Sequence, residues 1–205
     1  MTAGSVHLSV VRHGETEANA LGRYMGHGDS PLTPIGLAQV DAVAVRIAKR
    51  PPDAIFASDL LRAARTAEVI GAACGVSVQV DARLRERHVG LLQGMTDDEA
   101  RAGHPDVFRE LDRVASDYVV PGGESADAVR ARVAAFVDDV MKEPPGQRVL
   151  VVAHGGVARG LLWHLLDIPF RASRWACCDN TSLSTFRRKH GMWILERWND
   201  TAHLA

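Results

Sequence analysis

The sequence lacks the features that mark secreted, membrane-spanning and disulfide-rich proteins. Its 205 residues include three cysteines, Cys74, Cys177 and Cys178, and no Cys-x-x-Cys spacing that would suit a zinc site. We therefore expect reduced and mostly buried thiols in a cytoplasmic protein. No stretch approaches the roughly 18 uninterrupted apolar residues of a membrane span, and the first five residues have no signal-peptide pattern.

An excess of charge of one sign is also missing. The formal net charge is -1 at pH 7, with 24% charged and 46% hydrophobic residues. This composition excludes a disordered chain and gives no indication of nucleic acid or an anionic membrane as a partner. Any cationic site must therefore be assembled locally by folding. The length suits one domain, and no internal repeat or low-complexity linker divides it.

Strand and helix patterns alternate along most of the chain. Helix patterns follow the strands at residues 54–57 and 148–153 after short connections, and two late strands near residues 182–186 and 193–198 predict an edge hairpin. This order indicates an α/β three-layer sandwich, in which a mainly parallel sheet carries helices on both faces. The strand patterns of the parallel part lie at residues 6–11, 54–57, 76–80 and 148–153.

Local signals predict where the helices begin and end. Thr33 is a capping hydroxyl, and Pro34 after it suits the first helical position. Ser58 is expected to cap the next helix, which Gly75 ends. The buried face of the first of these helices is expected to hold Leu37, Val40, Ala44 and Ile47.

The stretch from about residue 91 to residue 124 does not fit this alternation. Thr96, with Glu99 three residues later, forms a capping box for a short helix. A second short helix is expected near residues 106–116, before a Val-Pro-Gly-Gly turn and a longer helix over residues 125–142. We interpret the stretch as a small helical cap within a single domain that spans residues 1–205.

Basic side chains follow the strands whose ends a parallel sheet brings together. Arg12 and His13 come directly after the first strand, Arg62 lies in the first turn of the helix after the second, and His154 follows the strand at residues 148–153. Because ligands of such sheets bind beyond the carboxyl ends of the strands, these groups should meet around one dianion. Further backbone N–H donors are expected at the helix starts marked by Gly14, Gly155 and Gly156.

Two other kinds of site use some of the same residue types. A zinc or iron site would need His13, His154, Asp59 and Glu86 as ligands. The arginines beside the imidazoles would repel a cation, and no pair has metal-type spacing, so we expect no metal. A serine hydrolase is disfavoured because the Gly-x-Ser-x-Gly motif is absent.

A set of motifs beginning with Arg12-His13-Gly14-Glu15-Thr16 and Asn19 runs along nearly the whole chain. The other members are Gly26, Asp29-Ser30-Pro31-Leu32-Thr33 with Gly36, Ser58-Asp59-Leu60 with Arg62, Thr66-Ala67-Glu68, Leu84-Arg85-Glu86 with Gly90 and Gly94, Gly122-Gly123-Glu124-Ser125, Ala153-His154-Gly155, Asn180-Thr181-Ser182, and Trp198-Asn199-Asp200 with His203-Leu204. Together they resemble the histidine phosphatase superfamily, which includes cofactor-dependent phosphoglycerate mutases.

The resemblance implies a phosphomonoester hydrolase that acts on small phosphorylated metabolites, without a cofactor. It implies His13 as the nucleophile that forms a phosphohistidine. Glu86 would protonate the leaving oxygen and then activate water. Attack requires a neutral imidazole, and we expect the flanking cations to favour that form of His13. A small phosphorylated substrate is the implied partner, and a homodimer is left open.

The remaining matched residues would bind the phosphoryl group. Arg12, Arg62 and His154 would contact its equatorial oxygens, with Asn19 and the Gly155 N–H as further contacts. The planar fork of arginine matches phosphate oxygens, and preorganised donors stabilise the charge that develops there during transfer.

Hydrolase and mutase share this site chemistry, so other residues must separate them. The resemblance implies that a mutase carries an adjacent arginine pair in its cap, whereas the arginines here, Arg101, Arg109 and Arg113, are not adjacent. The mutase-like run at residues 86–88 is present, but Val89 replaces the aromatic residue that follows it. We therefore favour hydrolysis, with a mutase as the alternative.

Met25 and Val89 stand where phosphoserine phosphatases of the superfamily carry polar side chains. These apolar residues favour a broader or less polar leaving group over a narrow phosphoserine or sugar-phosphoglycerate phosphatase. Comparable turnover of several small phosphomonoesters is therefore expected. An inactive phosphate-binding module is a further alternative, disfavoured because His13, Arg62, Glu86 and His154 are all present.

Overall fold

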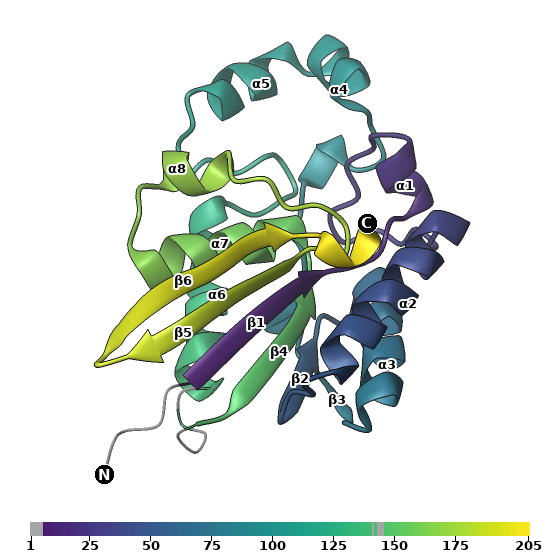
Figure 1. Cartoon of the computed structure of the whole chain (residues 1–205). Coiled ribbons are helices and arrows are strands. Elements are labelled where there is room, and N and C mark those ends of the chain that lie inside the picture. Colours follow the sequence, from purple (N-terminus) through teal and green to yellow (C-terminus); the bar gives the residue numbers. More distant parts are fainter. Residues whose placement is uncertain (1–5, 141, 143–145) are drawn as a thin grey trace.

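A six-stranded mixed sheet forms the centre of the computed structural model, which describes residues 6–140, 142 and 146–205 (Figure 1). The strand order is β3-β2-β4-β1-β5-β6. The parallel strands are β1 (Val6–Arg12), β2 (Ala54–Ala57), β3 (Val78–Val80) and β4 (Arg148–Ala153). The antiparallel edge strands are β5 (Leu183–Lys189) and β6 (Met192–Asp200). The expected mainly parallel sheet with an edge hairpin is confirmed.

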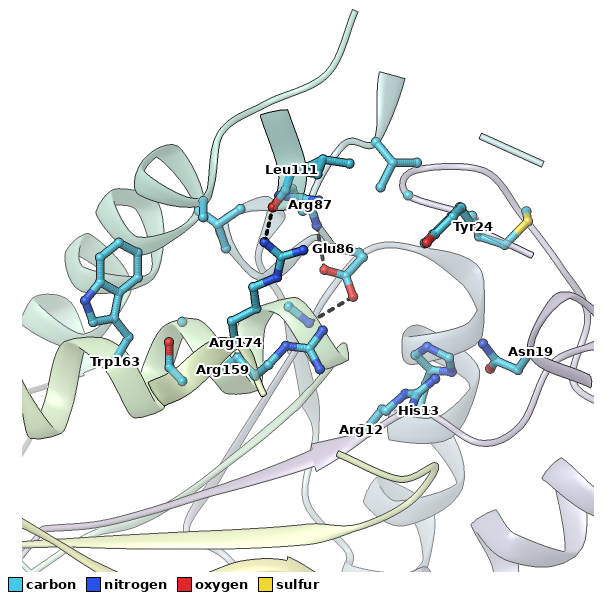
Figure 2. Close-up of a pocket in the computed structure, with 18 of the residues that line it drawn as sticks. Arg12, His13, Asn19, Tyr24, Glu86, Arg87, Leu111, Arg159, Trp163 and Arg174 are labelled. Carbon is cyan, nitrogen blue, oxygen red and sulfur yellow. Dashed lines mark hydrogen bonds between the residues drawn. The ribbon is translucent and has the colours of Figure 1, made fainter. Parts of the chain in front are cut away.

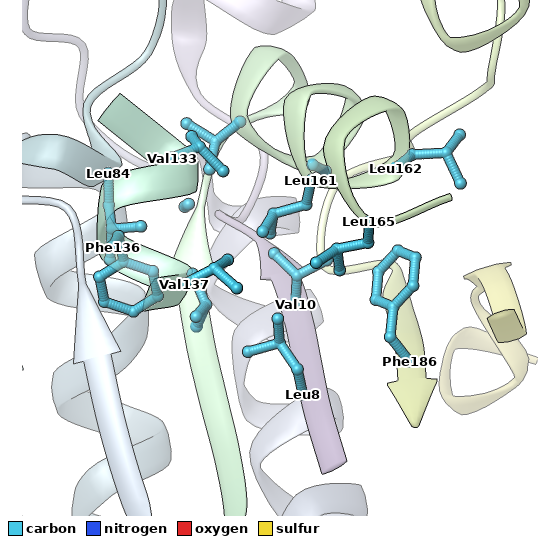
Figure 3. Packing of buried hydrophobic residues seen from close by; sticks show 14 of the residues in the cluster. Leu8, Val10, Leu84, Val133, Phe136, Val137, Leu161, Leu162, Leu165 and Phe186 are labelled. Atoms are coloured by element: carbon cyan, nitrogen blue, oxygen red, sulfur yellow. The ribbon is translucent and has the colours of Figure 1, made fainter. Parts of the chain in front are cut away.

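Helices cover both faces of this sheet (Figure 1). On one face, α2 (Pro34–Ala48) and α3 (Leu61–Cys74) bury Val43, Ile47 and Ile70 against β2 and β4. On the other, α6 (Ala126–Val140) and α7 (Gly155–Leu166) contribute Phe136 and Leu161 to a core that also holds Val10 of β1 and Phe186 of β5 (Figure 3). The α/β three-layer sandwich is therefore confirmed.

The central strand β4 explains why its sequence is almost continuously apolar. Val151 and Ala153 belong to the core under α6 and α7, whereas Leu150 and Val152 belong to the core under α2 and α3. Each is at most 2% exposed. A strand buried on both faces needs no polar alternation.

Two short helices lie beyond the carboxyl edge of the parallel strands (Figure 1). They are α4 (Asp97–Gly103) and α5 (Pro105–Asp112), and the 3-10 helix η2 (Gly90–Leu92) precedes them. The expected capping box forms, because Thr96 and Glu99 each accept the other's backbone N–H. A separate apolar cluster of Val89, Leu92, Ala100, Phe108 and Val120 holds this region together. The division into one domain with a cap at about residues 91–124 stays a prediction.

Several local expectations were wrong. Leu37 is 52% exposed, so the buried face of α2 is built by Val40, Ala44 and Ile47 without it. Ser58 does not cap α3, which begins at Leu61; its Oγ instead accepts the N–H of Leu60. Strand β3 and helix α5 are shorter than expected, and the expected helix at residues 125–142 includes residue 141, which lies outside the described residues.

The remaining elements are short, and the cysteines are only partly buried. They are α1 (Glu17–Ala20), η1 (Ala82–Leu84), α8 (Phe170–Arg174) and η3 (Ala202–Leu204). Cys178 is buried as expected, Cys74 is half-buried, and Cys177 is exposed. Within the described residues, no helix has both the length and the apolar character needed to cross a bilayer.

Candidate active site

The carboxyl ends of β1 and β4 open into a pocket of about 400 Å³ beneath the cap (Figure 2). Arg12 and His13 enter it from the end of β1, and Arg62 enters from the first turn of α3. His154 directly follows β4 and is fully buried beside His13, with a distance of 5.2 Å between the ring centroids, but it is not part of the pocket wall. The structure thus brings together the four basic residues that the sequence placed at one rim.

The imidazole of His13 is held in one tautomer. Its Nδ1 lies 2.7 Å from the carbonyl oxygen of Gly14, which only accepts hydrogen bonds, so Nδ1 carries the proton. Nε2 therefore keeps its lone pair and accepts a hydrogen bond from Arg62 Nε at 3.2 Å. Burial holds the pKa of His13 well below its ordinary value, and the charges of His154, Arg12 and Arg62 lower it further. The neutral form expected from the sequence therefore depends first on burial and second on the cations.

His154 is oriented by Ser58. Ser58 Oγ accepts the N–H of Leu60 and lies 2.9 Å from His154 Nε2, with which it shares a second hydrogen bond. Nδ1 of His154 is buried without a hydrogen-bond partner among the described residues. Arg12 Nε is likewise buried without a hydrogen-bond partner among the described residues. Since buried polar atoms are normally satisfied, two unpartnered ones beside His13, one of them on a guanidinium group, are typical of an anion site.

Arg62 binds the loop that follows α1. Its two Nη atoms donate to the carbonyl oxygens of Gly26 and Gly28, each at 2.8 Å. One turn later, Thr66 Oγ1 donates to the Arg62 carbonyl and accepts the N–H of Gly14 at 3.2 Å. The expectation that Gly14 supplies a free donor is therefore wrong, because α3 already uses that N–H group.

Glu86 reaches the start of α7 from the loop after η1. One carboxylate oxygen accepts the N–H of Gly156 at 3.0 Å, and the other accepts the N–H of Arg87 at 2.7 Å (Figure 2). Burial raises the pKa of Glu86, but these two donors and the charges of Arg159 and Arg62 outweigh it and hold that pKa below its ordinary value. Glu86 is thus a carboxylate here, and the Gly156 N–H is not free for phosphate as expected.

The other predicted contact residues divide into two groups. Asn19, Met25 and Val89 line the pocket, whereas Gly155 is buried at the start of α7 and is not part of the pocket wall. The Asn19 side-chain oxygen accepts a hydrogen bond from Asn180 Nδ2 at 3.1 Å, so its amide group keeps two donors. The roles assigned to Asn19 and Gly155 stay predictions.

Sequence reasoning missed the far part of the pocket wall. Arg87, Arg159 and Arg174 line it, together with Trp163 and Phe170 (Figure 2). Arg159 could have been found, because it lies about one turn after Gly155 on α7 and therefore on the same helix face. Arg174 could not, because only the tertiary position of α8 brings it to the pocket.

The residues of the metal alternative do not assemble into a ligand set. Asp59 is engaged by the guanidinium of Arg85, with Nε donating to Oδ1 at 2.7 Å. In the described part of the chain, no group of three His, Cys, Asp or Glu side chains is placed to hold a metal ion. The cations around His13 also make the pocket unfavourable for a further positive charge.

The same arrangement of motifs is found in a known family. The family model of the histidine phosphatase superfamily (branch 1) matches residues 8–201. The chain belongs to this superfamily. It is 36% identical to a metal-independent phosphoserine phosphatase of Arabidopsis thaliana, over 97% of this chain and 83% of that protein.

Two further members of the superfamily show how widely the named activities of its members vary. A probable phosphoglycerate mutase of Yersinia pestis is also 36% identical, over 97% of this chain and 95% of that protein. A mycobacterial glucosyl-3-phosphoglycerate phosphatase, solved with VO3, superposes with a TM-score of 0.86 at 33% identity, covering 94% of this chain and 98% of the other. Family membership is therefore secure, whereas the leaving group must be argued from the pocket.

Proposed function

We propose that the chain hydrolyses phosphomonoesters of small metabolites through a phosphohistidine on His13, without a metal ion. The observation that carries the proposal is the unprotonated Nε2 of His13, fixed by Gly14 and surrounded by cationic donors. A neutral nucleophile in a preorganised cationic pocket is what phosphoryl transfer requires. Family membership supports the same chemistry.

In the first step, Nε2 of His13 attacks phosphorus and the bond to the leaving oxygen breaks. Arg12, Arg62 and His154 stabilise the charge on the equatorial oxygens. Arg12 Nε and His154 Nδ1 are the buried polar atoms of this group that lack partners among the described residues. Arg62 exchanges its bond to His13 for one to the phosphoryl group. The leaving oxygen takes a proton from Glu86, which becomes a carboxylate.

Glu86 must gain that proton when substrate binds. In the free protein its pKa is held below the ordinary value, so it is ionised. A phosphate dianion beside it raises this pKa and offsets the nearby arginine charges. In the second step the carboxylate takes a proton from water as water attacks the phosphohistidine, which releases phosphate and restores His13.

Hydrolysis is favoured over phosphoryl return to the substrate. The cap arginines Arg101, Arg109 and Arg113 are engaged by acidic neighbours on the cap itself, and none lines the pocket. The cap therefore lacks the second anion-binding group expected of a mutase. Phosphoserine and glucosyl-3-phosphoglycerate, named for two of the relatives, are the first substrates to test.

The proposal is tested by phosphate release from p-nitrophenyl phosphate, phosphoserine and 3-phosphoglycerate, with 2-phosphoglycerate formation scored in parallel. We expect phosphate release that vanadate inhibits and EDTA does not, and a loss of roughly a thousandfold or more in His13→Ala. His190→Ala is the control, because His190 is exposed on the β5–β6 turn. Wild-type activity in His13→Ala, or activity that EDTA abolishes, would overturn the mechanism.

A further inference from the structure

Glu86 lies in a loop, and side chains from other parts of the chain hold its backbone. Residues 85–89 lie between η1 and η2 and belong to no helix or strand. The carbonyl oxygen of Glu86 accepts two hydrogen bonds, from His27 Nε2 at 2.7 Å and from Arg132 Nη2 at 3.1 Å. Neither His27 nor Arg132 is part of the pocket wall. The proposed acid is therefore held from outside the pocket by two residues that have no role in the phosphoryl chemistry described above.

Arg132 connects this loop to helix α6. Its Nη1 donates to the carbonyl oxygen of Arg83 at 2.6 Å, and its guanidinium group forms an ion pair with Glu124 at 2.9 Å. The same carboxylate oxygen of Glu124 accepts the N–H of His88 at 2.9 Å. Hydrogen bonds to charged groups are strong and directional. Arg132 and Glu124 thus hold the backbone on both sides of Glu86.

His27 connects Glu86 to the residue that binds the phosphoryl group. A carbonyl oxygen only accepts hydrogen bonds, so His27 Nε2 carries the proton and donates it to Glu86. The carbonyl oxygens on either side of His27, those of Gly26 and Gly28, both accept hydrogen bonds from Arg62. One short loop, residues 26–28, therefore contacts both Arg62 and the backbone of Glu86.

The loop at residues 26–28 also packs closely on the residues after Glu86. A Cβ atom at Gly26 would lie 3.0 Å from the backbone nitrogen of Val89 and 3.3 Å from the carbonyl oxygen of Arg87. The rings of His27 and His88 meet edge to face, with 4.8 Å between their centroids. The two loops thus move as one packed unit, and a change at His27 is transmitted to Glu86.

We propose that His27 is a positioning residue for Glu86, which keeps the carboxyl group at the leaving oxygen while Arg62 holds the phosphoryl group. Arg132 supports the same carbonyl oxygen from α6. The proposal rests on the proposed function for the role of Glu86 as the acid. An acid displaced by about 1 Å transfers its proton much less efficiently, so the effect of His27 is exerted through geometry.

The kinetic test compares leaving groups. His27→Phe keeps a ring and loses the donor, and we expect kcat to fall roughly tenfold or more for an alkyl phosphate but less than about threefold for p-nitrophenyl phosphate. His27→Gln is the matched control, because its amide N–H can replace Nε2, and it should restore most of the alkyl phosphate activity. Arg132→Lys, which cannot reach both carbonyl oxygens, should show the same dependence on the leaving group as His27→Phe.

A double-mutant cycle tests whether His27 acts through Glu86. In a Glu86→Gln background there is no acid to position, so His27→Phe should lower kcat for the alkyl phosphate by less than about twofold further. A residue that only stabilises the fold would give the same loss in both backgrounds.

A measurement without turnover uses the ¹³C NMR signal of the Glu86 carboxyl carbon, assigned by its loss in Glu86→Gln. A loosened backbone weakens the hydrogen bonds from the Gly156 and Arg87 N–H groups, so His27→Phe should raise the pKa of Glu86 by roughly 0.5 or more, whereas His27→Gln should not. An unchanged pKa in His27→Phe, equal losses with both substrates, or a full further loss in Glu86→Gln would refute the proposal. An inactive wild type, or an active His13→Ala, would refute the proposed function instead, and the NMR comparison would still decide whether His27 positions Glu86.

Discussion

At the scale of single residues, the site depends on two neutral imidazoles held among cations. His13 and His154 are 4% and 0% exposed, and each has a defined partner for one ring nitrogen, Gly14 O and Ser58 Oγ respectively. In both residues burial is the largest cause of a lowered pKa. The nucleophile is thus kept unprotonated by its position in the fold, and arginine charges add to the effect.

Two buried neutral histidines make the stability of the free protein depend on pH. Because their folded pKa values lie well below the ordinary value of 6.5, the unfolded chain binds more protons than the native protein at lower pH. The free energy of unfolding should therefore fall as the pH drops below about 6.5, by up to ~1.4 kcal/mol per pH unit for each histidine. Urea unfolding at about pH 7.5 and 5.5 measures this change.

His154→Gln should show a shallower fall in stability between the two pH values than the wild type. His190→Gln is the control and should keep the wild-type dependence, because His190 is exposed. If His154→Gln and the wild type lose the same stability on acidification, His154 is not held neutral by the fold.

At the scale of elements, α7 organises much of the pocket. Its first residues follow His154, the N–H of Gly156 binds Glu86, and Arg159 and Trp163 lie on later turns. A Cβ atom at position 156 would lie 2.0 Å from Glu86 Oε1, so a larger residue there would displace the Glu86 carboxylate. The helix start thus sets the position of the proposed acid as well as that of His154.

Gly156→Ala should therefore impair proton transfer. We expect kcat/KM to fall roughly 10- to 100-fold for alkyl phosphates and less for p-nitrophenyl phosphate, whose leaving group needs less protonation. Glu86→Gln should show the same dependence on the leaving group, more strongly. Gly160→Ala is the helix control, because its Cβ would meet only Val129 and Val133 at 3.6 and 3.9 Å. A uniform loss with both kinds of substrate in Gly156→Ala would contradict this role of the glycine.

The elements themselves were largely predictable, because their signals are local. Thr33 and Pro34 start α2, Gly75 ends α3 in the left-handed conformation, and Thr96 with Glu99 starts α4. Leu37 was misplaced because helical spacing alone does not fix which of two adjoining stripes faces the sheet. Ser58 was misplaced because its hydroxyl is needed by a residue 96 positions away, His154, which no local pattern reveals.

At the scale of the whole molecule, the sheet topology determines which residues meet. Strands β1, β2 and β4 are neighbours and parallel, so the residues after them reach one rim although the chain separates them widely. The sequence could predict Arg12, His13, Arg62 and His154 at this rim from that rule. It could not predict Arg87, Arg159 and Arg174 as one cluster, because their convergence depends on how α7, α8 and the loop after η1 pack.

The most direct test of the central claim is to trap the phosphorylated protein. Glu86→Gln is mixed with p-nitrophenyl phosphate and quenched rapidly. The leaving group of this substrate needs little protonation, so the variant should still be phosphorylated. Because the variant lacks the carboxylate that activates water, the phosphorylated form should accumulate. Intact-mass and peptide analysis should then show one phosphoryl group on His13, stable in alkali and lost in acid. No adduct in wild type or Glu86→Gln, or an adduct on any other residue, would contradict a phosphohistidine mechanism at His13.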